Sequence, residues 1–113
     1  MEEQLDRVAI YRLHAGFCKT LADASRLLII NELGRAELPV GELARRLGLN
    51  QSNVSKHLAL MRERGLVVTR REGANIYYSL SDPRISGAIR LLTDVQADQI
   101  EKRRSLASSR VDA

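Results

Sequence analysis

Hydrogen-bonding side chains are concentrated in one short segment, NQSNVSKH, near the middle of the 113-residue chain. They belong to Gln51, Ser52, Asn53, Ser55 and Lys56. A glutamine side chain forms a bidentate pair with adenine, a serine hydroxyl bonds to several base edges, and a lysine reaches guanine or a phosphate. The chemistry that this segment offers is therefore recognition of nucleic-acid groups through hydrogen bonds.

An apolar stripe runs through the same segment and predicts the helix that must position these side chains. Val54, Leu58 and Met61 recur at helical spacing. Asn50 is a suitable N-cap before this helix, and Gly65 is a suitable end to it. One face of the helix is thus made to pack on a core, and the opposite face is left to be read against DNA.

A second short helix is predicted directly before this one. Pro39 fits the start of a helix, because the N–H that proline lacks needs no partner there, and Gly48 supplies the end. Two short helices joined by a tight turn that contains Gly describe a helix-turn-helix.

The period of the apolar residues changes after Gly65. The sequence LVVTRREGANIYYSL is rich in β-branched and aromatic residues and predicts two strands, at about 67–71 and 76–80, joined by a Gly/Asn turn. Arg70, Arg71 and Asn75 flank a hairpin tip with almost no bulk. Such a hairpin reaches an adjacent groove or the DNA backbone as a wing. The alternative is a solvated hairpin that only closes the small sheet.

Three more helices complete the predicted fold. One covers about residues 3–18, a second begins near Asp23 with Gly34 as its C′ residue, and a long last helix opens at Asp82-Pro83. The fold class is mainly α with a β-hairpin wing, in the order α-α-α-α-β-β-α. We assign residues 1–103 to one domain and residues 104–113 to a flexible C-terminal tail.

The positive charge of the chain is predicted to lie in its middle. The formal net charge is +4, but residues 45–75 hold seven basic and two acidic side chains, against eleven basic and twelve acidic ones elsewhere. A basic segment of this kind attracts phosphates, so a nucleic-acid partner is the natural inference. A solvated basic face is the alternative.

The composition also excludes several classes of protein. No apolar run reaches the roughly 18 residues needed to span a bilayer, and the N-terminal MEEQLDRV lacks the apolar region of a signal peptide. A single cysteine forms no internal disulfide. We therefore expect a cytoplasmic protein without a membrane partner. No catalytic constellation or Gly-rich phosphate loop is visible, so no enzyme is expected.

Three stretches together resemble a known family. They are LADASRLLIINEL, LPVGELARRLGLNQSNVSKHLALMRERGLV and RREGANIYYSL, and they cover about residues 15–82. They are similar to the ArsR/SmtB winged helix-turn-helix regulators. The resemblance implies a homodimeric repressor that binds double-stranded operator DNA with an inverted repeat and dimerises through its first and last helices. It also implies base reading by Gln51, Ser52, Asn53, Ser55 and Lys56, with Arg71, Gly73 and Asn75 on the wing.

The chain departs from that family at the usual metal sites. Metal sensors of the family carry Cys-Val-Cys where this chain has Pro39-Val40-Gly41. The second family site uses His and carboxylates on the last helix, which here offers Asp94, Asp98 and Glu101 but no His. Oxygen ligands alone suit hard ions and not zinc, nickel or arsenite. We therefore expect no soft-metal site within one protomer and no cofactor, and the effector stays unknown.

Two alternatives remain open at this stage. Cys18 is a candidate sensor of redox state or metal, although we favour a buried packing role for its thiol and an interface role for His14. The second alternative is that the chain is a winged-helix module for protein–protein assembly. Such modules often lose base-reading side chains, whereas Gln51, Ser55 and Lys56 are present here.

Overall fold

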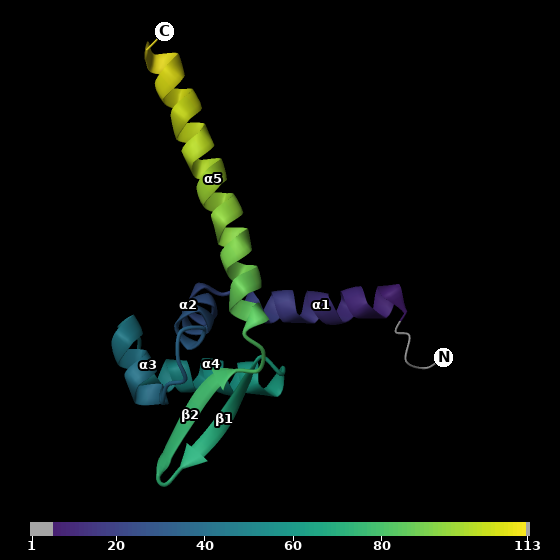
Figure 1. Cartoon of the computed structure of the whole chain (residues 1–113), viewed down its shortest axis with the longest axis vertical. Coiled ribbons are helices and arrows are strands. Elements are labelled where there is room, and N and C mark those ends of the chain that lie inside the picture. The colour runs from purple at the N-terminus through teal and green to yellow at the C-terminus, as the bar shows by residue number, and fades with distance from the viewer. Residues whose placement is uncertain (1–5, 113) are drawn as a thin grey trace.

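The computed structural model describes the backbone of residues 6–112 and the side chains of residues 6–109. Within this range five helices and one two-stranded sheet follow each other in the predicted order (Figure 1). The elements are α1 (Arg7–Leu21), α2 (Ala24–Leu33), α3 (Val40–Leu47), α4 (Gln51–Glu63), β1 (Val67–Glu72), β2 (Asn75–Leu80) and α5 (Arg84–Asp112). The expected first helix, at 3–18, is observed at 7–21, so it begins four residues and ends three residues later than predicted; residues 3–5 lie outside the described part.

The predicted cap residues begin and end the central helices. The Asn50 carboxamide oxygen accepts a hydrogen bond from the Asn53 backbone N–H at 3.1 Å, so Asn50 is the N-cap of α4. Gly48 ends α3 with a φ of 65°, a left-handed conformation that favours glycine. An N-cap such as Asn50 stabilises a helix by about 1 kcal/mol.

Gly34 has a different role from the one predicted. It ends α2 in the right-handed helical conformation, with a φ of −67°, so no left-handed C′ position requires glycine here. A Cβ atom at this residue would lie 2.7 Å from the Ser86 hydroxyl oxygen on α5. The absence of a side chain therefore permits the close approach of α5 to the end of α2, a packing constraint that sequence spacing does not reveal.

The core lies between α2, α3, α4 and the base of the hairpin. Its buried apolar residues are Ile29, Ile30, Leu33, Leu38, Leu43, Ala44, Val54, Leu58, Met61, Leu66 and Val67. The three residues of the predicted stripe on α4 are fully buried, which confirms that stripe. The core therefore holds α4 by one face only.

The hairpin forms an antiparallel pair in which Val67 lies opposite Leu80 and Glu72 lies opposite Asn75. Gly73 and Ala74 are left to form the two-residue turn, and Gly73 has a φ of 63°. The loop before α3 pairs with the outer edge of β2, because Leu38 and Tyr78 exchange backbone hydrogen bonds of 3.0 and 2.9 Å. This pairing anchors the hairpin beside the helix-turn-helix.

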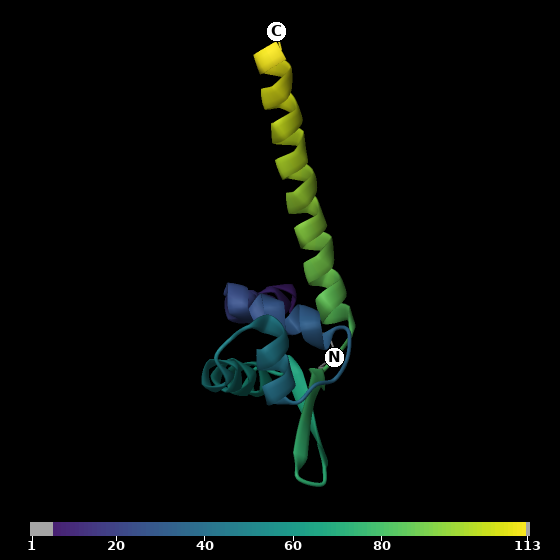
Figure 2. The ribbon, with the colours of Figure 1, turned by 90° about the vertical axis from the view of Figure 1, so that its left-hand side faces the viewer.

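Helices α1 and α5 project from the body as two arms (Figure 1), and Figure 2 shows the projection of α5 from a second side. The radius of gyration is 18.1 Å, compared with about 13 Å for a compact chain of this length. The arms expose large apolar side chains: Val8, Ile10, Tyr11, Leu13 and Phe17 on α1, and Leu91, Leu92, Val95, Ile100 and Leu106 on α5.

Helix α5 also extends further than predicted. The segment from residue 104 was expected to be a tail, but the helix continues through it to Asp112. The flexibility expected for residues 104–113 stays a prediction.

Candidate nucleic-acid interface

All five predicted base-reading residues lie on the exposed side of α4. Gln51, Ser52, Asn53, Ser55 and Lys56 are exposed, whereas the apolar stripe of the same helix is buried. The turn from α3 is fixed by a hydrogen bond from the Leu49 N–H to the Ala44 carbonyl oxygen at 3.0 Å. The arrangement is that of a helix-turn-helix in which the second helix presents short hydrogen-bonding side chains outward.

His57 differs from its neighbours on α4. It is half-buried, and its Nδ1 atom lies 3.3 Å from the Arg26 Nη1 atom on α2. Arg26 and His57 are 31 positions apart in the sequence. The sequence therefore did not predict this contact.

The two arginines of the predicted wing have different surroundings. The Arg70 guanidinium donates to the Glu37 carboxylate, lies 3.6 Å from Glu72 Oε1, and stacks over the Tyr77 ring at 4.8 Å from its centre. Its hydrogen bonds hold the pKa of Glu37 below the ordinary value. Arg71 points to the other face of β1 and forms no ion pair with any described residue. Of the two, Arg71 is therefore the one available to a phosphate.

The basic charge of the central segment is partly compensated. Glu42 accepts hydrogen bonds from Arg45 at 3.0 Å and Arg46 at 2.9 Å, and these bonds lower its pKa to about 2. Arg46 also lies 3.5 Å from Glu32 of α2. The acidic partners come from outside residues 45–75, so the count along the sequence overstated the local charge.

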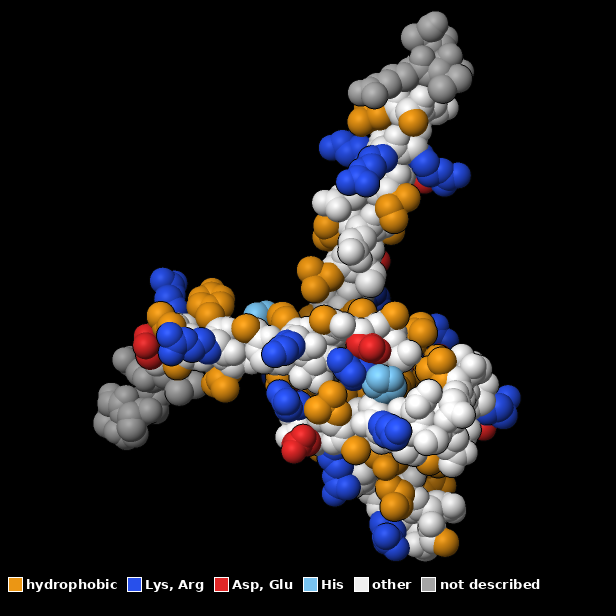
Figure 3. Space-filling model, turned by 180° about the vertical axis from the view of Figure 1, so that it is seen from behind, with side chains coloured by type: hydrophobic (Ala, Val, Ile, Leu, Met, Phe, Trp, Pro, Cys, Tyr) orange, Lys and Arg blue, Asp and Glu red, His pale blue; other side chains and the backbone are white. Residues whose placement is uncertain are grey.

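Four basic side chains of this segment form no ion pair among the described residues. They are Lys56, Arg62, Arg64 and Arg71. On the face seen in Figure 3, Asp and Glu are sparse among the Lys and Arg side chains of the body and hairpin. A basic surface therefore remains, but it is smaller than the sequence predicted.

Cys18 is exposed in a single protomer, so the expected burial of its thiol does not occur within one chain. Its sulfur lies 3.5 Å from Nε2 of His14, one helical turn earlier on α1. Asp94, Asp98 and Glu101 are also exposed. Residues 6–112 contain no group of three or more His, Cys, Asp or Glu side chains arranged to hold a metal ion.

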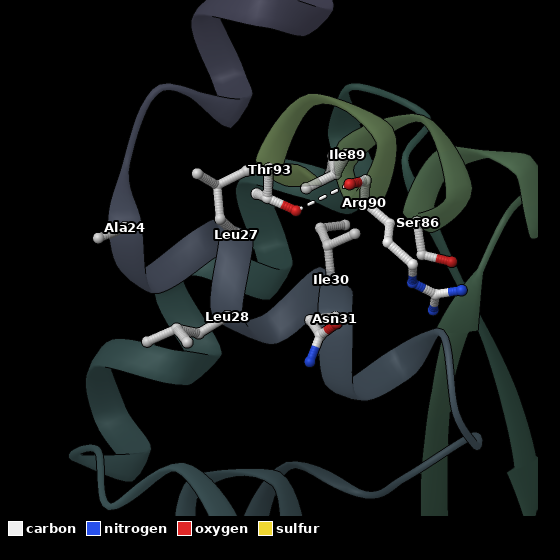
Figure 4. Close-up of a pocket in the computed structure, with 9 residues that line it drawn as sticks. All are labelled: Ala24, Leu27, Leu28, Ile30, Asn31, Ser86, Ile89, Arg90 and Thr93. Carbon is white, nitrogen blue, oxygen red and sulfur yellow. Dashed lines mark hydrogen bonds between the residues drawn. The ribbon is translucent and has the colours of Figure 1, made fainter. Parts of the chain in front are cut away.

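Two apolar grooves flank the base of α5. One has a volume of about 390 Å³ and lies between α2 and α5, where Leu27 and Ile30 point toward Ile89 and Thr93 and Leu28 lines the rim (Figure 4). The other, also about 390 Å³, includes Cys18 and Val95. The grooves continue the exposed apolar surface of the two arms. No helix in the described part is long and apolar enough to cross a membrane.

A helix-turn-helix followed by an antiparallel hairpin defines the winged helix-turn-helix class. Residues 23–69 match the family model described as bacterial regulatory protein, arsR family. The chain is 46% identical over 74 residues to the transcriptional activator HlyU of Vibrio cholerae, covering 66% of this chain and 68% of that protein. It is 44% identical over 84 residues to the transcriptional repressor PagR of Bacillus anthracis, covering 73% and 83%. The chain belongs to the ArsR family of transcriptional regulators.

A solved structure supports the same assignment. The winged helix-turn-helix DNA-binding domain of Mb0332 from Mycobacterium bovis, described as homodimeric and as a possible ArsR-family regulator, superposes with a TM-score of 0.76. Its sequence identity is 31%, and the match covers 90% of this chain and 95% of that one. The resemblance in sequence is thereby confirmed, and the chain is a regulator of transcription and not an enzyme.

Proposed function

We propose that this regulator is a homodimeric repressor that reads an inverted-repeat operator with helix α4 of each protomer. The observation that carries the proposal is the division of α4 into two faces. Val54, Leu58 and Met61 are fully buried, while the polar residues between them are exposed. A helix held in this way presents hydrogen-bonding groups to base edges without losing its packing.

Within this interface, we assign base contacts to Gln51 and Ser55, and contacts with bases or phosphates to Ser52, Asn53 and Lys56. Arg71 and Asn75 of the hairpin would contact the DNA backbone beside the groove that α4 enters. Arg70 supports the hairpin instead, because its guanidinium is already occupied by two carboxylates and a ring. This division revises the expectation that both wing arginines contact DNA.

The proposal of a dimer rests on the exposed apolar side chains of α1 and α5. Leu92 is 67% exposed on α5 and Tyr11 is 65% exposed on α1, and apolar side chains lie beside both. Contiguous apolar patches of this kind mark interaction surfaces on small proteins. A second copy placed by a two-fold axis would cover α1, α5 and the two grooves at the base of α5. Its α4 would lie about one DNA turn away, near 34 Å.

The function has a direct test. The protein is incubated with a random-sequence duplex library, and bound DNA is recovered and sequenced. The proposal expects an imperfect inverted repeat, and a gel shift with the DNA upstream of the regulator's own gene should show the same sequence. Recovery of no common sequence would favour the alternative, a winged-helix module for protein–protein assembly. Since the proposed partner is operator DNA, we expect the protein in the cytoplasm.

A further inference from the structure

Arg26 of α2 joins three helices through polar contacts. Its Nε atom donates to the Thr20 carbonyl oxygen near the end of α1 at 2.5 Å, and its Nη1 atom lies 3.3 Å from Nδ1 of His57 on α4. Its backbone N–H donates to the Asp23 carboxylate at 3.0 Å, which caps the start of α2. One half-buried side chain therefore connects the arm α1 with the helix proposed to read DNA.

The contact with α1 is placed where a cation is favourable. The last four carbonyl groups of a helix have no partner within it, and α1 ends at Leu21, so the Thr20 carbonyl is one of these. The partial negative charge of the helix end also attracts a guanidinium. Thr20 is only 4% exposed, and its hydroxyl donates to the Gly16 carbonyl oxygen at 3.0 Å. The acceptor for Arg26 is therefore held firmly in the structure.

The contact with α4 has a defined direction. A guanidinium has donors and no acceptor, so Nδ1 of His57 is the acceptor in this contact. The Asp23 carboxylate lies near both groups, and its pKa is lowered chiefly by the hydrogen bond from the Arg26 N–H and further by the charge of Arg26. The cluster is a compact polar joint between α1, α2 and α4.

We infer that Arg26 is a positioning residue that couples the direction of the dimer arm α1 to the orientation of α4. This inference rests on the proposed function. In a two-fold dimer, the distance and angle between the two α4 helices follow from how each α4 is fixed to its own arm. Arg26 thereby sets which spacing between half-sites the dimer accepts, without touching the DNA.

The test compares operators that differ only in spacing. The probes are the inverted repeat recovered from the random library and the same repeat with one base pair inserted at its centre. One inserted base pair moves and rotates one half-site relative to the other, so a dimer with fixed helices discriminates against it. For Arg26→Gln we expect affinity for the natural spacing to fall about tenfold, as for loss of a hydrogen bond to a charged group. Affinity for the altered spacing should change little, so the spacing preference shrinks.

Two control variants separate positioning from charge. Arg35→Gln removes the same charge just after α2, where the residue is exposed and forms no ion pair with a described residue, and should leave the spacing preference intact. His57→Asn keeps an acceptor oxygen close to the position of Nδ1 and should retain the preference, whereas His57→Leu should lose it. If Arg26→Gln does not fold, as judged by thermal melting, the His57 pair of variants decides the question.

Two results would overturn the inference. An equal loss on both spacings would mean that Arg26 only stabilises the protomer. A salt dependence of log K that is flatter by about one unit, with the spacing preference unchanged, would mean that Arg26 contacts a phosphate. Failure of the proposed function is a separate result, because the wild-type protein would then select no inverted repeat at all.

Discussion

The guanidinium of Arg70 and the carboxylate of Glu37 form an ion pair between β1 and the loop before α3, with Nε 3.0 Å from Oε1. Leu38, the next residue in that loop, pairs with Tyr78 of β2 through backbone hydrogen bonds. Both strands of the hairpin are thus attached to the segment that leads into the helix-turn-helix. The neighbouring Arg71 takes no part in this attachment, which separates the roles of two adjacent arginines.

The first prediction distinguishes these two arginines by salt dependence. Arg71→Ala should weaken binding to all DNA sequences and flatten the slope of log K against log salt by about one unit, because one phosphate contact is lost. Arg70→Ala should leave that slope nearly unchanged. Fluorescence anisotropy titrations at several salt concentrations measure both slopes. Equal flattening by the two variants would show that Arg70 leaves Glu37 and binds phosphate.

The second prediction concerns base reading by α4. Gln51→Ala or Ser55→Ala should each weaken operator binding by about 1–3 kcal/mol and hardly change binding to random DNA. The comparison of the two DNAs matters, because phosphate contacts contribute equally to both. Thermal melting of each variant serves as the control for folding. Losses of the same size on operator and random DNA would remove these residues from base recognition.

The central fold was predictable because its signals are local. The caps at Asn50 and Gly48, the stripe that ends at Met61, and the hairpin turn at Gly73 each depend on residues close in sequence. Short-range rules of backbone conformation and apolar spacing are sufficient at such positions. The order of elements followed from these signals alone.

Contacts between distant elements were not predictable in the same way. The ion pair of Arg70 joins residues 33 apart, and the contact of Arg26 with His57 joins residues 31 apart. Gly34 was predicted only as the residue that ends α2, but its lack of a side chain also permits the close approach of Ser86. Burial of Cys18 was predicted from residue type, yet the thiol is exposed on α1 within one protomer. Each error concerns the arrangement of helices in space.

The third prediction follows from the pKa of Glu42. Hydrogen bonds from Arg45 and Arg46 lower this pKa from 4.5 to about 2. The ionised Glu42 carboxylate therefore stabilises the folded state fully above pH 4.5, and this stabilisation is lost as the pH falls towards 2. The stability difference between wild type and Glu42→Gln should therefore be constant near neutral pH and shrink across this acid range. Urea unfolding at a series of pH values measures it. A difference that persists unchanged at pH 2 would contradict the assignment.

The fourth prediction concerns the effector. The chain has one Cys and two His, and His57 is occupied by Arg26, so a complete thiolate and imidazole site within one protomer is hard to build. We expect Zn²⁺ or arsenite at micromolar concentration not to release operator DNA. Gel shifts with and without each ion measure this for the wild type and for Cys18→Ser.

The Cys18→Ser variant also tests the redox alternative. The thiol beside His14 is exposed within one protomer. If an oxidant or metal releases the wild type from DNA and not the variant, Cys18 is the sensor. If both proteins behave alike, the effector acts elsewhere, and the grooves between the arms are the next place to search.

The measurement that tests the proposed function most directly is a hydroxyl-radical footprint of the wild-type protein on its selected operator, combined with sedimentation of the free protein. We predict a dimer at micromolar concentration and two protected half-sites on one face of the DNA, centred about one helical turn apart. A monomer that protects a single half-site with the same affinity, or a protein that protects no preferred sequence, would contradict the proposal of a dimer reading DNA through α4.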